Sequence, residues 1–445
     1  MAIDIAELVD SEGGTVSRRI FSEEDIYQLE LKQVFARSWL FLAHESQVRN
    51  PGDFVTTYMA EDPIIVCRGL EGQIHAFLNS CMHRGNNVCR PDKGNAKSFM
   101  CPYHGWTYNT SGELVGVPGF KELYNEELVK AEWGLVPVTR VENYKGMIFG
   151  TWDEEAPPLE DYLGEIRWGM DILLDQRAGG TEMVGGIFKW IMNCNWKFAA
   201  DNFIGDSYHG SVTHKSAQLA GHATVARSLD RRPSARKPAS FAQNDNGFTI
   251  NTKYGHGHNA NVRPWEGDSE FDKFAEPLKS YYKQTAAEVE QRLGYFRTRE
   301  VRVVACSVFP NLSLSSTTRM IHVWHPRGPN KTEVWLMTLV DKDAPVEIRD
   351  MQLLAAQRHF SPSGMFEVDD GENWEQSTLA ARGLIARRHS LNYQIGLGHE
   401  EVIDDESSPP RAPGFASERN QRNFYRRWAQ MMADQAWGGS LTNKT

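Results

Sequence analysis

Short segments in which apolar and polar residues alternate fill the stretch from residue 38 to residue 158. The segments 52–58, 63–68 and 73–79 are rich in β-branched and aromatic residues, and Gly, Pro and Asp separate them. This pattern is typical of strands joined by tight turns. Residues 107–114 add a hairpin with its turn at Ser111–Gly112. The stretch therefore predicts a small all-β domain.

The flanking stretches, residues 1–37 and 159–445, mix helical and strand patterns. Long antiparallel strands are predicted at 300–310, 320–325 and 332–341. Helices are predicted at 168–174, 277–293 and 418–437. Residues 222–262 are polar with little periodicity, which predicts a long loop that acts as a lid. Overall, the pattern predicts an α+β protein whose larger domain holds an antiparallel sheet flanked by helices.

Composition and charge exclude several classes of protein. Of 445 residues, 40% are hydrophobic and 11% are aromatic, which is ample for a large core. The net charge of -10, from 48 basic and 58 acidic residues, argues against nucleic acid as a partner. No apolar run is long enough to span a membrane, and Met1–Asp10 lacks the features of a secretory signal. We expect a cytoplasmic protein, and the six scattered cysteines do not suggest a disulfide framework.

The strongest chemical signal lies inside the predicted all-β domain. Cys81-Met-His83 is followed, after a gap, by Cys101-Pro-Tyr-His104, so that each of two loops offers one thiolate and one imidazole. Zinc accepts two cysteines and two histidines. A two-iron, two-sulfide cluster also accepts this set, with two cysteines on one iron and two histidines on the other. The order of ligands favours the cluster, because zinc fingers pair cysteine with cysteine.

A second pattern, Asn202-x3-Asp206-x2-His209-x4-His214, gathers two imidazoles and a carboxylate within thirteen residues. On one helix the first three side chains would share a face, and a bend after Gly210 would bring His214 to the same point. Two histidines with a carboxylate from elsewhere form the facial ligand set of non-haem iron oxygenases. The alternative is a helix with two surface histidines.

A rival metal site is possible at His256 and His258, because alternation along a strand would place both rings on one face. No pattern places a carboxylate beside these two histidines. We therefore expect them to have a structural role or to lie at the edge of a pocket.

Both motifs together resemble the large (α) subunit of the Rieske non-haem iron aromatic-ring-hydroxylating dioxygenases, the group that acts on naphthalene, biphenyl and phenylpropionate. The resemblance covers nearly the whole chain, including 36–44, 182–186 and 323–326. It implies a helix-grip catalytic domain, residues 1–37 and 159–445, into which a Rieske domain at 38–158 is inserted.

The resemblance also implies two metal cofactors and their ligands. A [2Fe–2S] Rieske cluster would bind Cys81, His83, Cys101 and His104. A mononuclear Fe(II) would bind His209, His214 and Asp370, with Asp369 as the alternative third ligand. The substrate pocket would be lined by Asn202, Phe203, Val304, Cys306, Phe360 and Phe366.

In the family, the residue matching Asp206 is not a metal ligand. It hydrogen-bonds the iron histidine, here His209, and reaches a cluster histidine, expected to be His104, of the next subunit. The resemblance therefore implies a symmetric trimer in which the cluster of one chain serves the iron of its neighbour.

We expect cis-dihydroxylation of a polycyclic aromatic hydrocarbon, such as naphthalene or phenanthrene, by O2 and electrons from NAD(P)H. Expected partners are a small β subunit in an α3β3 assembly, a ferredoxin and a reductase. Alternatives are a biphenyl- or phenylpropionate-type dioxygenase, a Rieske monooxygenase acting on an aromatic acid, and a Rieske electron carrier without oxygenase activity.

Overall fold

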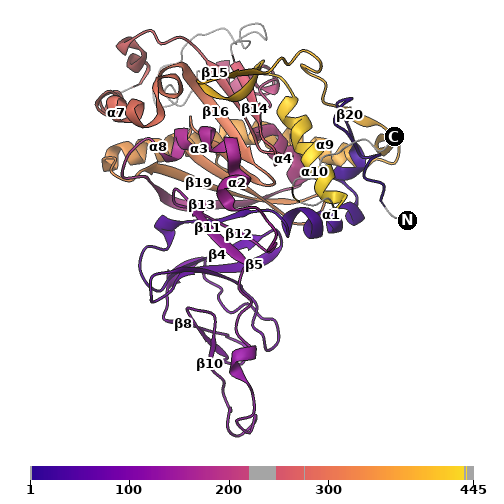
Figure 1. Ribbon diagram of the computed structural model, residues 1–445, viewed down its shortest axis with the longest axis vertical. Helices are drawn as coiled ribbons and strands as arrows, with labels where there is room; N and C mark the ends of the chain where they lie inside the picture. Colours follow the sequence, from indigo (N-terminus) through magenta and orange to yellow (C-terminus); the bar gives the residue numbers. More distant parts are fainter. Residues whose placement is uncertain (1–2, 220–246, 275, 435–436, 438–445) are drawn as a thin grey trace. The chain divides into compact units, whose positions relative to one another are not determined.

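The computed structural model describes residues 3–219, 247–274, 276–434 and 437 (Figure 1). The chain divides into two compact units. The smaller unit is Phe35–Leu159, and the larger combines Met1–Val34 with Glu160–Thr445. The expected bounds of the inserted domain, 38–158, lie inside the smaller unit.

The smaller unit is built from ten short strands in three antiparallel sheets. One sheet has the order β6-β5-β4-β7: Ile74–Leu78, Asp62–Arg68, Asp53–Met59 and Lys93–Asn95. The second is β10-β9-β8: Leu114–Gly116, Thr107–Asn109 and Ser98–Met100. The third is β11-β12-β3: Arg140–Tyr144, Met147–Thr151 and Leu40–His44. The predicted hairpin is confirmed, because β9 pairs with β10 and Gly112 has a φ of +84° at the turn.

A nine-stranded sheet forms the centre of the larger unit, and every neighbouring pair in it is antiparallel. Its order begins with β13-β19-β18-β17-β16: Thr181–Met192, Thr332–Asp341, Met320–Pro326, Leu312–Ser315 and Val301–Val308. It continues with β15-β14-β22-β21: Gly257–Val262, Gly247–Asn251, Ser408–Pro413 and Ile403–Asp405. The three long strands expected from alternation are β16, β18 and β19.

The described helices of the larger unit include α1, α3, α4 and α5: Glu24–Glu30, Arg167–Leu174, Trp196–Phe203 and Lys215–Leu219. They also include α7, α8, α9 and α10: Leu278–Leu293, Val346–Phe360, Met365–Ala381 and Arg419–Met432. Helix α4 packs on β16 and β18, and α10 packs on β14 and β15. α10 buries Phe424 and Trp428 completely, and full burial of such a side chain contributes roughly 1.5–3 kcal/mol.

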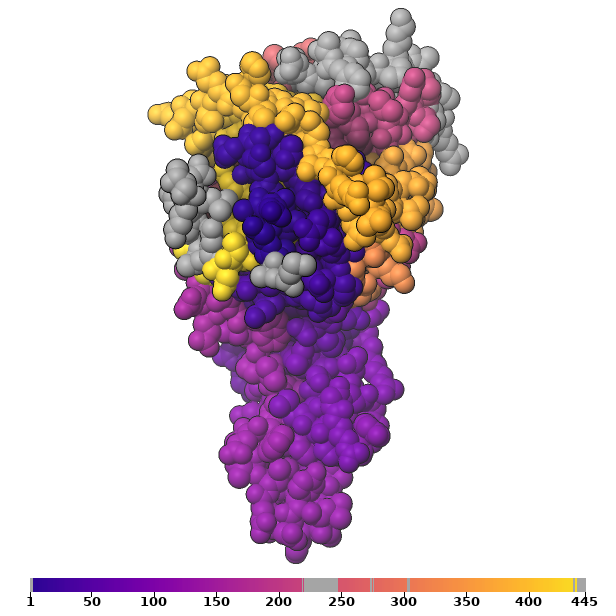
Figure 2. Space-filling model, turned by 90° about the vertical axis from the view of Figure 1, so that its right-hand side faces the viewer, coloured from indigo at the N-terminus to yellow at the C-terminus, as the bar shows by residue number. Residues whose placement is uncertain are grey.

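Both ends of the larger unit meet at one buried carboxylate. Glu30 of α1 pairs with Lys197 of α4 at 2.5 Å, and neither side chain is exposed. The indole N–H groups of Trp196 and Trp428 also donate to Glu30, at 3.0 and 2.8 Å. Figure 2 shows the consequence at the surface, where indigo N-terminal residues lie beside yellow C-terminal residues. Because a buried charge must be paired, this contact fixes α1, α4 and α10 together.

The expectation of one long loop at 222–262 is wrong for its second half. Residues 247–262 form the strands β14 and β15 inside the nine-stranded sheet. Their polar side chains concealed the alternation, because Thr249 and Asn259 are buried in the sheet. Residues 222–246 lie outside the described residues. Among the helices that the structure describes, none has the length and apolarity required to cross a membrane.

Candidate metal centres

The two Cys–His loops of the smaller unit have the same backbone fold. In each, a glycine donates its N–H to the cysteine carbonyl. This glycine lies two residues after the histidine in the first loop and directly after it in the second. The bonds are Gly85 to Cys81 at 2.8 Å and Gly105 to Cys101 at 2.9 Å. Both glycines have positive φ, +71° and +75°, a conformation that disfavours other residues. The sequence Cys-x(1–2)-His-x(0–1)-Gly therefore forms a tight loop that is used twice.

These loops bring the four expected cluster ligands together. The rings of His83 and His104 lie 4.5 Å apart between centroids, and the thiols of Cys81 and Cys101 are buried. The Nδ1 atoms of both rings are buried without a hydrogen-bond partner. Unpaired buried nitrogens beside two thiols suit a metal cluster, since buried polar atoms otherwise require partners.

Neighbouring groups favour the charged form of Cys101. The hydroxyl of Tyr108 lies 3.3 Å from the Cys81 sulfur. Burial would raise the pKa of Cys101, but hydrogen bonds from the N–H groups of Tyr103 and His104 and from the side chains of Cys81 and Asn86 together outweigh it and lower that pKa. A thiolate is the form that binds iron, so this environment is prepared for a metal.

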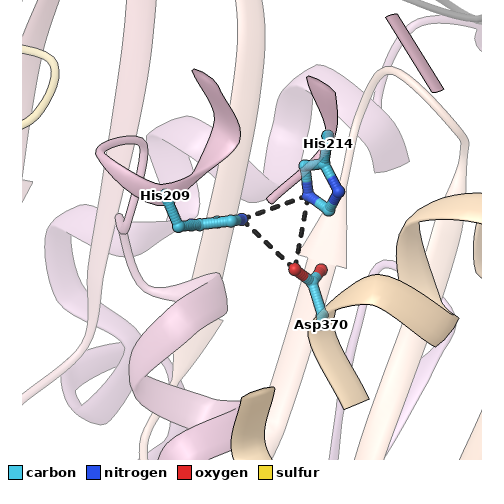
Figure 3. A group of neighbouring side chains, drawn as sticks. All are labelled: His209, His214 and Asp370. Carbon is cyan, nitrogen blue, oxygen red and sulfur yellow. Dashed lines mark hydrogen bonds and ion pairs between the residues drawn. The ribbon is translucent and has the colours of Figure 1, made fainter. Parts of the chain in front are cut away.

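The second candidate centre lies in the larger unit, where three segments converge (Figure 3). Asn202, Asp206 and His209 were expected on one helix, but α4 already ends at Phe203. A 3₁₀ turn at His209–Ser211 carries the first histidine instead. The carbonyl of Asn202 accepts the N–H of Asp206 at 3.0 Å, which holds the turn after the helix. His214 lies just before α5, and the third group comes from α9.

His209, His214 and Asp370 form a nearly equilateral triangle of donor atoms (Figure 3). The two Nε2 atoms are 3.2 Å apart, and each lies 3.3 Å from Oδ1 of Asp370. Ligand bonds of about 2.1 Å at right angles would separate donors by about 3.0 Å. The three donors therefore fit one metal ion, and two imidazoles with one carboxylate are a set typical of non-haem iron.

A separate carboxylate lies at the outer nitrogen of each histidine. Oδ2 of Asp206 is 3.2 Å from Nδ1 of His209, and Oδ2 of Asp369 is 3.5 Å from Nδ1 of His214. Burial lowers the pKa of His209, but Asp206 and Asp370 outweigh it and raise that pKa to about 10. Such outer carboxylates fix which nitrogen of a histidine faces the metal.

Three of the expected pocket residues cluster beside the triangle. The ring of Phe366 lies 4.6 Å from the ring of His214, and Phe360 lies 5.8 Å from both Phe366 and Phe203. Cys306 is buried on β16 and pairs in register with Leu314 of β17. The side chain of Val304 lies outside the described residues.

Sequence reasoning missed other aromatic residues at this cluster. Trp324 and Trp374 both lie within 6.4 Å of Phe203 by ring centroids, and His322 stacks on Trp324. Strand alternation places His322 and Trp324 on one face of β18, which could have indicated them. Nothing in the local sequence indicated that this face meets α4.

The rival metal site at His256 and His258 is not supported. Both ring nitrogens of His256 have backbone contacts, at 2.7 Å to the Tyr162 carbonyl and at 2.8 Å from the Phe309 N–H. His258 instead stacks on Trp168, with centroids 5.3 Å apart and an interplanar angle of 8°. The hydrogen bonds of His256 support the structural role expected of these histidines.

Comparisons with known proteins agree with this geometry. The family described as "Ring hydroxylating alpha subunit (catalytic domain)" matches residues 159–434, and "Rieske [2Fe-2S] domain" matches residues 38–138. The biphenyl dioxygenase subunit alpha of Paraburkholderia xenovorans (strain LB400) is 42% identical over 448 residues, covering 97% of this chain and 94% of that protein. The chain belongs to the aromatic-ring-hydroxylating dioxygenase α subunits.

Other relatives in this group are named for different aromatic substrates. The benzene 1,2-dioxygenase subunit alpha of Pseudomonas putida is 40% identical over 443 residues, covering 98% of this chain and 94% of that protein. A crystal structure of a naphthalene 1,2-dioxygenase variant bound to phenanthrene has a TM-score of 0.86 and 35% identity, covering 97% of this chain and 95% of that one. Membership confirms the expected fold and enzyme class, with a Rieske [2Fe–2S] cluster and a mononuclear iron as cofactors.

Proposed function

We propose that this α subunit adds both atoms of O2 to neighbouring carbons of an uncharged aromatic hydrocarbon, giving a cis-dihydrodiol. The observation that carries the proposal is the triangle of His209, His214 and Asp370 beside the rings of Phe366 and Phe360. A metal ligand set and an apolar surface for a ring lie together there. We propose a polycyclic hydrocarbon such as naphthalene or phenanthrene as the substrate.

The roles of the chain's own residues follow from their positions. Cys81, His83, Cys101 and His104 would hold the cluster, and His209, His214 and Asp370 the mononuclear iron. When bound, the cluster supplies single electrons and the mononuclear iron supplies the place where O2 is activated. Two electrons and two protons are needed for each O2 that enters the product as two hydroxyl groups.

Binding of the substrate is assigned to the aromatic side chains. Phe203, Phe360 and Phe366 form an apolar cluster, and burial of a planar hydrocarbon against it contributes about 25 cal/mol for each Å² removed from water. An uncharged arene suits such a surface better than an aromatic acid, whose carboxylate would lose its hydration.

Biphenyl is the second candidate substrate. The relative named for biphenyl is 42% identical over nearly the whole chain, which is as strong a similarity as that to relatives named for other rings. A two-ring substrate that is not fused differs in length and twist from a fused one, so the shape of the pocket decides between them.

The proposed assembly contains a small β subunit, with three copies of each subunit, and receives electrons from a ferredoxin and a reductase. The relatives are named as α subunits, which supports a partner subunit. We further propose that Asp206 connects His209 to His104 of a neighbouring copy. The carboxylate of Asp206 lies 3.2 Å from His209 and keeps about a third of its side chain exposed, 32%, so another chain could reach it.

A product screen tests the proposal. The purified enzyme, supplied with O2 and a reconstituted electron donor, is offered naphthalene, phenanthrene, biphenyl and phenylpropionate separately. We expect cis-dihydrodiols from the fused hydrocarbons at the highest rate, and none from an Asp370→Ala control. A monohydroxylated product, or turnover of phenylpropionate alone, would contradict the proposed reaction or substrate class.

A further inference from the structure

A buried pair of one acidic and one basic residue joins α9, the helix that carries Asp370, to the nine-stranded sheet. Nε2 of His322, on β18, is 3.3 Å from Oε2 of Glu367, on α9, and at most 1% of either side chain is exposed. Among the residues that the structure describes, His322 is the only basic group in contact with Glu367. A buried carboxylate requires such a partner, because an unpaired one is strongly unfavourable.

The histidine of this pair is held rigidly. Its ring stacks on Trp324, with centroids 4.7 Å apart and an interplanar angle of 6°, and Phe203 packs on it at 4.9 Å. It projects from β18, which lies between β17 and β19 in the nine-stranded sheet. The ring of His322 therefore has a fixed position, and a helix that contacts it is held in place.

The acid of the pair lies one helical turn before a candidate metal ligand. Glu367 and Asp370 are three residues apart on the buried face of α9, so their side chains share that face. Acidic residues on a buried face do not set the rotation of a helix by hydrophobic packing. The ion-pair contact of Glu367 with His322, whose ring is held by Trp324 and Phe203, does set it.

The remainder of α9 has its own anchors. Glu375 accepts the N–H of Asn193 at 2.8 Å, and the Thr378 hydroxyl accepts the N–H of Asn195 at 2.9 Å. The start of the helix differs, because Gly364 at its N-cap offers no side-chain hydrogen bond. Asp370 thus lies between the anchored second half of α9 and the contact of Glu367 with His322.

We propose that Glu367 and His322 are positioning residues that hold the first turns of α9 against the sheet and so place Asp370 for the metal. The inference rests on the proposed role of Asp370 as a ligand. It assigns to this pair no contact with substrate. Without the pair, the start of α9 is held by the packing of Phe366 against His214 and Phe360, and Asp370 shifts away from the two histidines.

The test measures Fe(II) affinity of the holoenzyme after the mononuclear iron has been removed and returned under chelator competition. Glu367→Ala and His322→Phe should each weaken Fe(II) binding at least about tenfold, the effect typical of groups that orient a ligand. His322→Phe keeps a ring that can stack on Trp324, so this variant loses only the contact with Glu367. Glu367→Gln, which keeps the size of the side chain and a polar atom facing His322, should stay within about threefold of the parent.

The double variant distinguishes positioning from general destabilisation. Because either change alone breaks the contact, Glu367→Ala with His322→Phe should bind Fe(II) no more weakly than the weaker single variant. The EPR spectrum of the nitrosyl complex of Fe(II) should change in the single variants and remain as in the parent for Glu367→Gln. Glu372→Ala, an exposed glutamate on the same helix, is the matched control and should leave affinity unchanged.

Unchanged affinity in Glu367→Ala and His322→Phe, or losses that simply multiply in the double variant, would overturn the inference. If Glu367→Ala does not fold, as judged by circular dichroism and the absorption of the Rieske cluster, His322→Phe and Glu367→Gln decide. Asp370→Ala separates this inference from the proposed function. Retention of iron by that variant refutes the ligand set, whereas its loss beside unaffected pair variants refutes only the positioning role.

Discussion

Two adjacent aspartates on α9 have different contacts at the mononuclear site. Oδ1 of Asp370 lies 3.3 Å from the inner nitrogens of both histidines, whereas Oδ2 of Asp369 lies 3.5 Å from the outer nitrogen of His214. Neighbouring residues on a helix point about 100° apart, so the two carboxylates cannot exchange roles. Asp369, the alternative ligand by sequence, thus lies where a group would orient His214.

Substitution should separate these roles. Asp370→Ala should abolish binding of the mononuclear iron, whereas Asp369→Asn should weaken it by roughly tenfold, the usual effect of losing an orienting carboxylate. Iron content and Fe(II) titration of both purified variants provide the measurement. Stronger loss from Asp369→Asn than from Asp370→Ala would reverse the assignment.

A single hydroxyl should influence the cluster. Tyr108 lies 3.3 Å from the Cys81 sulfur and also accepts the N–H of Met82 at 3.1 Å, so its hydroxyl proton is available to the sulfur. A hydrogen bond to a cluster sulfur favours the reduced, more negative form. Tyr108→Phe should lower the midpoint potential by roughly 40 mV, the equivalent of about 1 kcal/mol for one electron. Protein-film voltammetry measures it, and an unchanged or higher potential would contradict this role.

At the scale of elements, α4 is held at its end by two tyrosines from distant segments. The hydroxyl groups of Tyr393 and Tyr425 donate to Asp201, at 2.8 and 2.5 Å. On α10, Asn420 donates to the carbonyl of Ile204 at 3.0 Å. These bonds fix the backbone just before Asp206 and His209, which is how helices remote in sequence determine the geometry of the metal centre.

The same carboxylate should make stability depend on pH. Burial raises the pKa of Asp201 to about 7, even though both tyrosine hydroxyls oppose the rise. The folded chain therefore holds this proton more tightly than the unfolded chain, so the contribution is complete below about pH 4 and is lost as pH rises through about 7. Between pH 5 and 8 the loss should be roughly 2–3 kcal/mol.

Chemical denaturation of the parent and of Asp201→Asn at pH 5, 6, 7 and 8 measures this effect. The difference in unfolding free energy between the two proteins should move in favour of the variant as pH rises. A constant difference across this range would show that Asp201 has the same pKa in the folded and unfolded chain, which would contradict the prediction.

The extent to which sequence predicted these elements depended on what each side chain meets. The strands of the smaller unit and β16, β18 and β19 were predicted because apolar residues alternate along them. β14 and β15 were missed because Asn259 is buried and donates to the Gly205 carbonyl at 3.2 Å, so a polar residue occupies a core position. The pair of His322 and Glu367 was missed because a partner more than forty residues away leaves no local pattern.

At the scale of the whole molecule, function requires two metal centres that lie in different units of the chain. The proposed cluster ligands lie in Phe35–Leu159, and the proposed mononuclear ligands lie in the larger unit. Both motifs and the identity of the family were readable from sequence, because ligand type and spacing are local. The substrate was not, because the aromatic cluster beside His214 is assembled from α4, β18, α8 and α9.

Loss of the proposed bridge should stop catalysis without loss of metal. Asp206→Ala removes the carboxylate at Nδ1 of His209 but none of the proposed ligands. We expect three irons per chain, two in the cluster and one mononuclear, with product formation reduced by more than about 100-fold. Iron analysis with single-turnover assays of the reduced enzyme provides the measurement. Near-normal product formation would refute the bridge.

The most direct test of the account is isotopic. The reduced enzyme is given naphthalene under ¹⁸O2 in ordinary water, and the diol is analysed by mass spectrometry. If both atoms of one O2 are added to the ring, as proposed, the product carries two ¹⁸O atoms. A product with one ¹⁸O atom, or with oxygen from water, would contradict the account.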